Sequence, residues 1–135
     1  MKTHTFRLEP EEDLRQSLEQ FLAQRKIDAA AMVTCVGSLS QVALRLAGAA
    51  GPTFREGDFE IVSLVGTLSR HGVHLHLAVA DARGAMFGGH LVEGCSVRTT
   101  AEIVLLELPG TTFRRVLDAS TGYRELRVDY KNSGA

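Results

Sequence analysis

The stretch from Gly72 to Leu91 constrains the fold more than any other part of the chain, because apolar side chains recur at every second position in its first half. Residues two apart in a β-strand point to the same face of the sheet. Residues 72–80 are therefore predicted to form a strand whose aliphatic side chains face the core. The same alternation places His74 and His76 together on the opposite face.

A third histidine, His90, follows a turn of small residues and the pair Gly88-Gly89. The glycines offer either a positive φ or a close backbone approach, so the chain can return His90 on a neighbouring strand beside His74 and His76. Neutral imidazole is a common metal ligand, and three protein ligands with an open position are typical of a reactive or exchangeable site. We expect a divalent transition metal here, zinc first. The alternative is polar histidines on the wetter face of a sheet, or core histidines bonded to backbone.

The rest of the chain predicts an α+β fold. Leu14, Leu18, Phe21 and Leu22 recur at three- and four-residue spacing and predict one main flanking helix over about residues 11–26. Alternating or continuous apolar runs predict about seven strands, in a mainly antiparallel sheet with minor helical turns elsewhere. The predicted strands cover residues 2–8, 29–36, 41–46, 59–68, 72–80, 96–108 and 125–130. A tight turn at Gly37-Ser38 is expected to separate the second from the third, and residues 48–57 are expected to form a surface loop.

Length and composition exclude several classes of protein. The 135 residues suit a single domain, residues 1–135, and the net charge of -1 gives no overall field that would attract a polyanion. No apolar run reaches the roughly 20 residues of a membrane helix. Cys35 and Cys95 form no recognisable pair, which suits free, buried thiols in a reducing cytoplasm. No nucleotide-binding glycine loop and no serine-hydrolase elbow are found.

Several segments together resemble the plant and prokaryote conserved domain family, also called PPC or DUF296, in its single-domain prokaryotic form. The match spans nearly the whole chain and is specific in combination. The segments that carry it are residues 37–39, 59–66, 74–76, 88–91, 97–103 and 121–126.

This resemblance implies an antiparallel sheet flanked by helices, assembly as a homotrimer, and, in some members, a metal at histidines matching His74, His76 and His90. Bacterial members are often described as DNA-binding. The plant proteins contact DNA through an AT-hook with an Arg-Gly-Arg-Pro core, which this chain lacks. DNA is therefore expected as a partner by resemblance only.

Glu102 falls within a strand that should bury apolar groups, and a buried carboxylate needs a partner. An ion pair with Arg98 or Arg45 is the first expectation. A contact across a trimer interface and a hydrogen bond from a metal-binding imidazole are the alternatives. Glu60 poses the same question, with a surface or paired role expected.

Two classes of function remain open. The sequence favours a non-catalytic assembly domain that binds a metal or small ligand and has a regulatory or DNA-associated role, because no second set of catalytic groups converges on the histidines. We therefore assign no catalytic residue. The alternative is a metal-dependent enzyme in which three histidines hold zinc or iron and Glu102 or Glu60 transfers protons.

Overall fold

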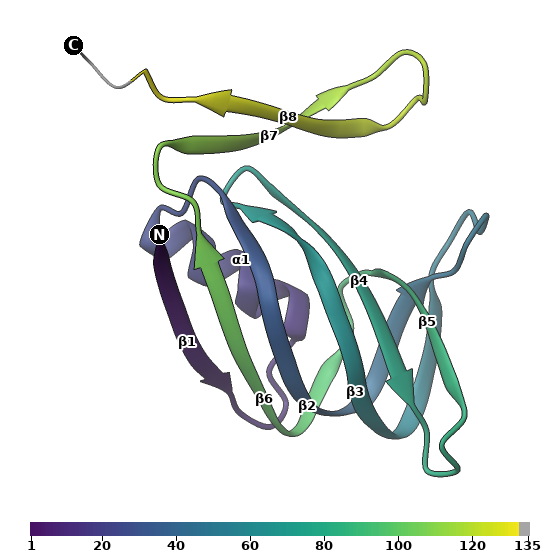
Figure 1. Ribbon diagram of the computed structural model, residues 1–135. Coiled ribbons are helices and arrows are strands. Elements are labelled where there is room, and N and C mark those ends of the chain that lie inside the picture. Colours follow the sequence, from purple (N-terminus) through teal and green to yellow (C-terminus); the bar gives the residue numbers. More distant parts are fainter. Residues whose placement is uncertain (133–135) are drawn as a thin grey trace.

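The computed structural model describes residues 1–132, which form eight strands in two antiparallel sheets and one α-helix (Figure 1). The elements are β1 (Lys2–Leu8), α1 (Leu14–Arg25), β2 (Ala30–Arg45), β3 (Thr53–Ser69), β4 (Gly72–Ala80), β5 (Met86–Leu91), β6 (Ser96–Glu107), β7 (Thr111–Leu117) and β8 (Arg124–Tyr130). The predicted antiparallel sheet with one flanking helix is confirmed. The minor helical turns expected elsewhere do not occur in the described part of the chain.

Helix α1 is shorter than predicted because its ends are set by capping. Asp13 is the N-cap: its side chain accepts hydrogen bonds from the backbone N–H of Gln16 (2.9 Å) and Gly94 (2.7 Å). Glu11, at φ 73°, cannot belong to the helix. The helix ends at Lys26 in the left-handed conformation. Leu14, Leu18 and Leu22 are fully buried and fix α1 against the sheet.

The larger sheet has the strand order β1-β6-β2-β3-β4-β5, with a further short pairing between β2 and β5. That pairing joins Leu44 to Leu91 and Arg45 to His90. Strands β2, β3, β4 and β5 therefore curl into a closed ring at one end of the sheet. The curl brings the end of β2 beside the end of β5.

The prediction of two strands separated by a turn at Gly37-Ser38 is wrong, because β2 runs through both residues. The residues form one long strand that includes Gly37. This position requires glycine, because a Cβ there would come within 2.0 Å of the carbonyl oxygen of Thr100 on β6. Irregularities in the β2–β6 register around Gly37 and Leu39 mark departures from a regular strand. Gly37 therefore allows close packing of β2 against β6 and does not form a turn. Residues 53–57, predicted as loop, likewise begin β3.

Strands β7 and β8 form a separate two-stranded hairpin that lies across one end of the larger sheet (Figure 1). The predicted last strand is confirmed, and β7 is an addition to the prediction. Phe113 donates its backbone N–H to the carbonyl of Asp28 at 2.9 Å. Lys131 forms an ion pair with the Asp28 carboxylate at 3.2 Å, so both chain segments at the open end of the hairpin contact this residue.

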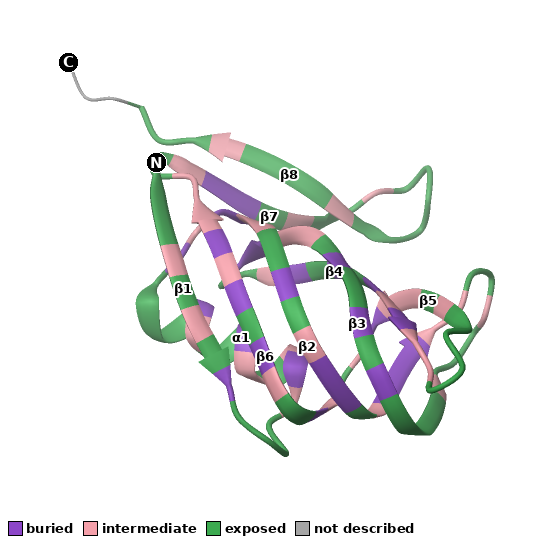
Figure 2. Cartoon of the chain, turned by 60° about the horizontal axis from the view of Figure 1, so that its bottom comes forward, coloured by how far each residue is buried: buried purple, intermediate pink, exposed green. Residues whose placement is uncertain are grey.

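Burial alternates along the central strands, with core residues on the face that α1 covers (Figure 2). The aliphatic residues of β4 predicted to face the core are all buried. Other aliphatic side chains remain outside the core: Val33 and Val36 on β2 and Val62 and Val65 on β3 are 49–58% exposed. The helix α1 is too short and too polar to span a membrane, and it is the only helix in residues 1–132.

Candidate metal centre

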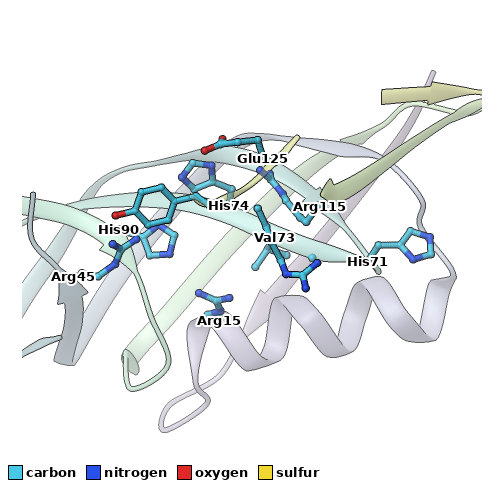
Figure 3. A pocket seen from close by; sticks show the side chains of 11 residues that line it. Arg15, Arg45, His71, Val73, His74, His90, Arg115 and Glu125 are labelled. Atoms are coloured by element: carbon cyan, nitrogen blue, oxygen red, sulfur yellow. The ribbon is translucent and has the colours of Figure 1, made fainter. Parts of the chain in front are cut away.

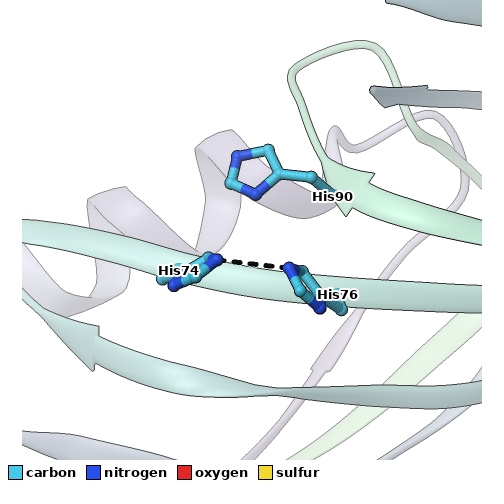
Figure 4. A group of neighbouring side chains, drawn as sticks. All are labelled: His74, His76 and His90. Atoms are coloured by element: carbon cyan, nitrogen blue, oxygen red, sulfur yellow. Dashed lines mark hydrogen bonds between the residues drawn. The ribbon is translucent and has the colours of Figure 1, made fainter. Parts of the chain in front are cut away.

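The three predicted histidines meet at one place on the sheet (Figure 4). His74 and His76 project from the same face of β4, and His90 of β5 pairs directly with His76 in the strand register. The Nε2 atoms of His74 and His76 are 3.2 Å apart, within hydrogen-bond distance. One ligand nitrogen from each histidine lies within 4.8 Å of the other two.

The glycine pair before His90 explains why this return strand fits. A Cβ at Gly88 would come within 2.6 Å of the Leu77 carbonyl oxygen, and one at Gly89 within 2.8 Å of the Arg45 carbonyl oxygen. Neither glycine has a positive φ. Of the two roles left open from the sequence, close backbone approach is therefore the one these glycines serve. It lets β5 lie between β4 and the end of β2.

The donor set fits a divalent transition metal such as zinc. Zinc binds histidine nitrogen at about 2.0–2.1 Å in a tetrahedron, which places neighbouring ligand nitrogens about 3.3 Å apart. The 3.2 Å between His74 and His76 meets this spacing. Three histidines would fill three positions of the tetrahedron and leave the fourth open.

A pocket of about 590 Å³ opens beside the histidines and shares His74 and His90 with them (Figure 3). Arg15 rises from α1 on one side of the pocket, and Arg115 and Glu125 of the hairpin lie on the opposite side. The complete lining is Arg15, Arg45, His71, Gly72, Val73, His74, His90, Arg115, Tyr123, Arg124 and Glu125. The pocket forms at an open edge, because β5 pairs only with the second half of β4.

The surroundings of His74 and His90 favour the neutral form of these two side chains. Burial, followed by the positive charge of Arg45, lowers the pKa of His90 to about 4. Partial loss of hydration, followed by the charge of Arg115, also lowers the pKa of His74, although its side chain is largely exposed. A neutral imidazole is the form that binds metal. Both histidines are therefore ready to act as ligands at neutral pH.

The acidic residues singled out from the sequence do not lie at this centre. Glu102 is exposed on β6, which is separated from β4 by β2 and β3, so it does not need the buried partner that was expected. Arg98 forms its ion pair with Asp58 instead, at 3.4 Å. Glu60 is also exposed. The expectation was wrong because it treated β6 as buried on both faces, whereas only the face that carries Val97, Ala101 and Ile103 is buried.

The pocket contains residues that sequence reasoning missed. Glu125 and Arg115 belong to the hairpin, and no local pattern connects a C-terminal hairpin with histidines some forty residues earlier. One sequence signal could have pointed to Glu125: it lies within residues 121–126, one of the segments that resemble the family. His71, in the turn before β4, also lines the pocket, and its Nε2 lies 3.2 Å from the carboxylate of Asp28.

The family model of the Plants and Prokaryotes Conserved (PCC) domain, also written PPC, matches residues 1–109. The chain belongs to the PCC family. The resemblance inferred from the sequence is therefore confirmed. The hairpin β7–β8 lies beyond the matched residues, so this PCC domain completes its pocket with a segment outside the family model.

Individual relatives extend the match. The PCC domain is 48% identical over 128 residues to a protein named bifunctional protein GlmU from Synechococcus, covering 95% of this chain and 20% of that protein. It thus spans about a fifth of the length of that relative. A hypothetical protein from Salmonella has 45% identity and a TM-score of 0.94, covering 96% of this chain and 94% of the other.

Two further solved structures share this fold. A metal-containing protein from Archaeoglobus fulgidus has 26% identity and a TM-score of 0.76, with 94% of each chain covered. A "putative DNA-binding protein" from Bacteroides thetaiotaomicron has a TM-score of 0.81 and covers 96% of this chain and 93% of its own. At 17% identity, that second likeness shows the fold alone.

Proposed function

We propose that this PCC domain, residues 1–135, is a non-catalytic homotrimeric protein that binds one divalent transition metal per chain, zinc first, through His74, His76 and His90. The observation that carries the proposal is the convergence of three imidazole nitrogens within 4.8 Å of one another. The metal-containing relative from Archaeoglobus fulgidus supports it. The two free, buried cysteines suit the cytoplasm, where we place the protein.

Elemental analysis of protein purified without a histidine tag tests the metal. We expect about one zinc per chain, and loss of most of it in His74→Ala, His76→Ala and His90→Ala, because each variant removes one of three ligands. His71→Ala is the matched control, since His71 lines the pocket but contacts Asp28 rather than the cluster. Metal content that is unchanged in all three ligand variants would disprove the site.

The homotrimer is proposed from the family resemblance, and the exposed valines of β2 and β3 support it. A subunit interface would remove these side chains from water, which is favourable at roughly 25 cal/mol per Å² of apolar surface. Light scattering should give three times the 14.6 kDa of one chain. A monomer at micromolar concentration would contradict the trimer.

A DNA-associated or regulatory role is the last part of the proposal and rests on the family resemblance and on two solved structures described as "putative DNA-binding" proteins. The chain contains no AT-hook, and its net charge is -1. Duplex binding that weakens steeply as salt rises would support direct phosphate contact. Absence of duplex binding at low salt would rule out direct DNA binding and would leave only the metal-binding role.

One observation favours the alternative of a metal-dependent enzyme: Glu125 lines the same pocket as His74 and His90. A carboxylate beside an open metal position can accept a proton from bound water or substrate. Zinc-loaded protein should then hydrolyse p-nitrophenyl acetate or p-nitrophenyl phosphate, and Glu125→Gln should abolish the turnover without loss of zinc. Equal rates for the two proteins would exclude Glu125 from such a reaction.

A further inference from the structure

The pocket beside the histidines is strongly positive although the whole chain is not. Its lining includes four arginines, Arg15, Arg45, Arg115 and Arg124, against a single carboxylate, that of Glu125. The chain as a whole has 15 basic and 16 acidic side chains. Positive charge is therefore concentrated at this pocket by the fold, and four guanidinium groups in one place repel one another unless an anion joins them.

Most of these arginines lack an acidic partner. In the part of the chain that the structure describes, Arg45, Arg115 and Arg124 form no salt bridge, whereas seven other basic residues do. Arg45 and Arg115 are also half-buried. Removing a charge from water without a partner costs free energy, so such positions are rare unless a ligand supplies the opposite charge.

The structure holds the arginines in place without neutralising them. Arg115 donates from Nη2 to the hydroxyl of Thr67 at 2.8 Å. Arg15 donates from Nη1 to the carbonyl of Leu91 at 2.9 Å. The strand register sets Arg45 beside His90. Three separate parts of the chain, α1, β2 and the hairpin, thus direct guanidinium groups to one pocket.

We propose that this pocket binds a small organic oxyanion, a molecule carrying a carboxylate or phosphate group, through Arg45 and Arg115. Guanidinium groups recognise both oxyanions through paired hydrogen bonds. His74 and His90 form part of the same wall, so the bound anion lies next to the metal; this last point rests on the proposed function, whereas arginine binding does not.

The dimensions favour a small molecule over DNA. A volume of about 590 Å³ lies within the range of roughly 300–1,000 Å³ that is typical of small-molecule sites. Val73 and the exposed ring of Tyr123 add apolar surface that suits an organic ligand. A duplex contacts phosphates spread along a basic stripe, whereas these arginines surround a single pocket.

The test is isothermal titration calorimetry with inorganic phosphate and with citrate, on metal-free and on zinc-loaded protein at fixed ionic strength. We expect saturable binding of one or both anions to the metal-free protein, the stronger of the two indicating the class of oxyanion. Arg45→Gln and Arg115→Gln should each weaken it about tenfold or more, because each removes a charge-assisted hydrogen bond. Glu125→Gln should strengthen anion binding, because it removes the one negative charge of the pocket lining. A misfolded variant would not bind the anion more tightly.

Arg114→Gln is the matched control. Arg114 precedes Arg115 on β7 but is exposed and pairs with Asp129 at 3.2 Å, so anion affinity should stay within about twofold. Equal weakening by Arg114→Gln would overturn the proposal, as would absence of binding to either form. Binding to the zinc-loaded protein alone, insensitive to the arginine changes, would overturn it while leaving the metal site intact. Displacement of the anion by a DNA duplex would point to nucleic acid instead.

Discussion

The three histidines of the candidate metal centre differ in their surroundings although they converge on one place. His90 is half-buried and beside Arg45, whereas His74 and His76 are exposed on the face of β4. The sequence predicted that the three side chains meet, because alternation places His74 and His76 on one face and the glycine pair returns His90 beside them. Both are features of neighbouring residues in the sequence. The effect of Arg45 on the pKa of His90 could not be predicted from the sequence, because it depends on pairing between the end of β2 and the end of β5.

We predict that His90 of the metal-free protein titrates near pH 4, below the ordinary value of 6.5. Histidine in the unfolded chain takes up a proton below about pH 6.5, whereas folded His90 stays neutral down to about pH 4. The free energy of unfolding should therefore fall as the pH drops from 6.5 toward 4. NMR titration of the ring protons measures the midpoint. Arg45→Gln should raise it, and a midpoint near 6.5 in the unaltered protein would contradict the prediction.

At the scale of elements, β5 and the hairpin β7–β8 build the site. Strand β5 places His90 only because two glycines allow it to lie against β4 and β2 at once. The hairpin brings Arg115 and Glu125 to the pocket and is fastened to the body at Asp28. Strand positions could be predicted from alternation, but the placement of the hairpin could not, since it depends on contacts between Lys131 and Asp28, which are far apart in the sequence.

We predict that Gly89→Ala weakens metal binding although all three histidines remain. The added Cβ would come within 2.8 Å of the Arg45 carbonyl oxygen, so β5 must shift and carry His90 with it. Such overpacking costs about 1–3 kcal/mol of stability. Zinc affinity and urea unfolding measure the two effects. Gly51→Ala is the control, because a Cβ there meets no atom within 4 Å; equal affinities in both variants would show that β5 tolerates the methyl group.

At the scale of the whole molecule, the fold separates a core covered by α1 from a surface on β2 and β3 with exposed valines. Alternation predicted the core well, because every second residue of β4 from Val73 is buried, and so are the apolar residues at every second position of β6 from Val97, whereas Thr99 is exposed. Two predictions were wrong: Gly37 continues β2 instead of ending a strand, and Glu102 is exposed because only one face of β6 is buried. The alternation of a strand predicts which residues share a face. It does not predict which face packs against another element or another subunit.

We predict that Val36→Asp and Val65→Asp convert the proposed trimer into monomers, because a buried carboxylate at a subunit interface lacks a partner. Light scattering at micromolar concentration measures the change. Gln24→Asp on the exposed side of α1 adds the same charge and should leave the trimer intact. A trimer that persists in both valine variants would place the interface on another surface.

The central claim is that His74, His76 and His90 bind a metal together, and X-ray absorption at the zinc edge tests it most directly. We predict a first shell of three histidine nitrogens at about 2.0–2.1 Å with one further light atom in the tag-free protein. The His90→Ala variant should lose the histidine pattern or the metal. Sulfur ligands at about 2.3 Å, or a zinc site unchanged in that variant, would contradict the claim.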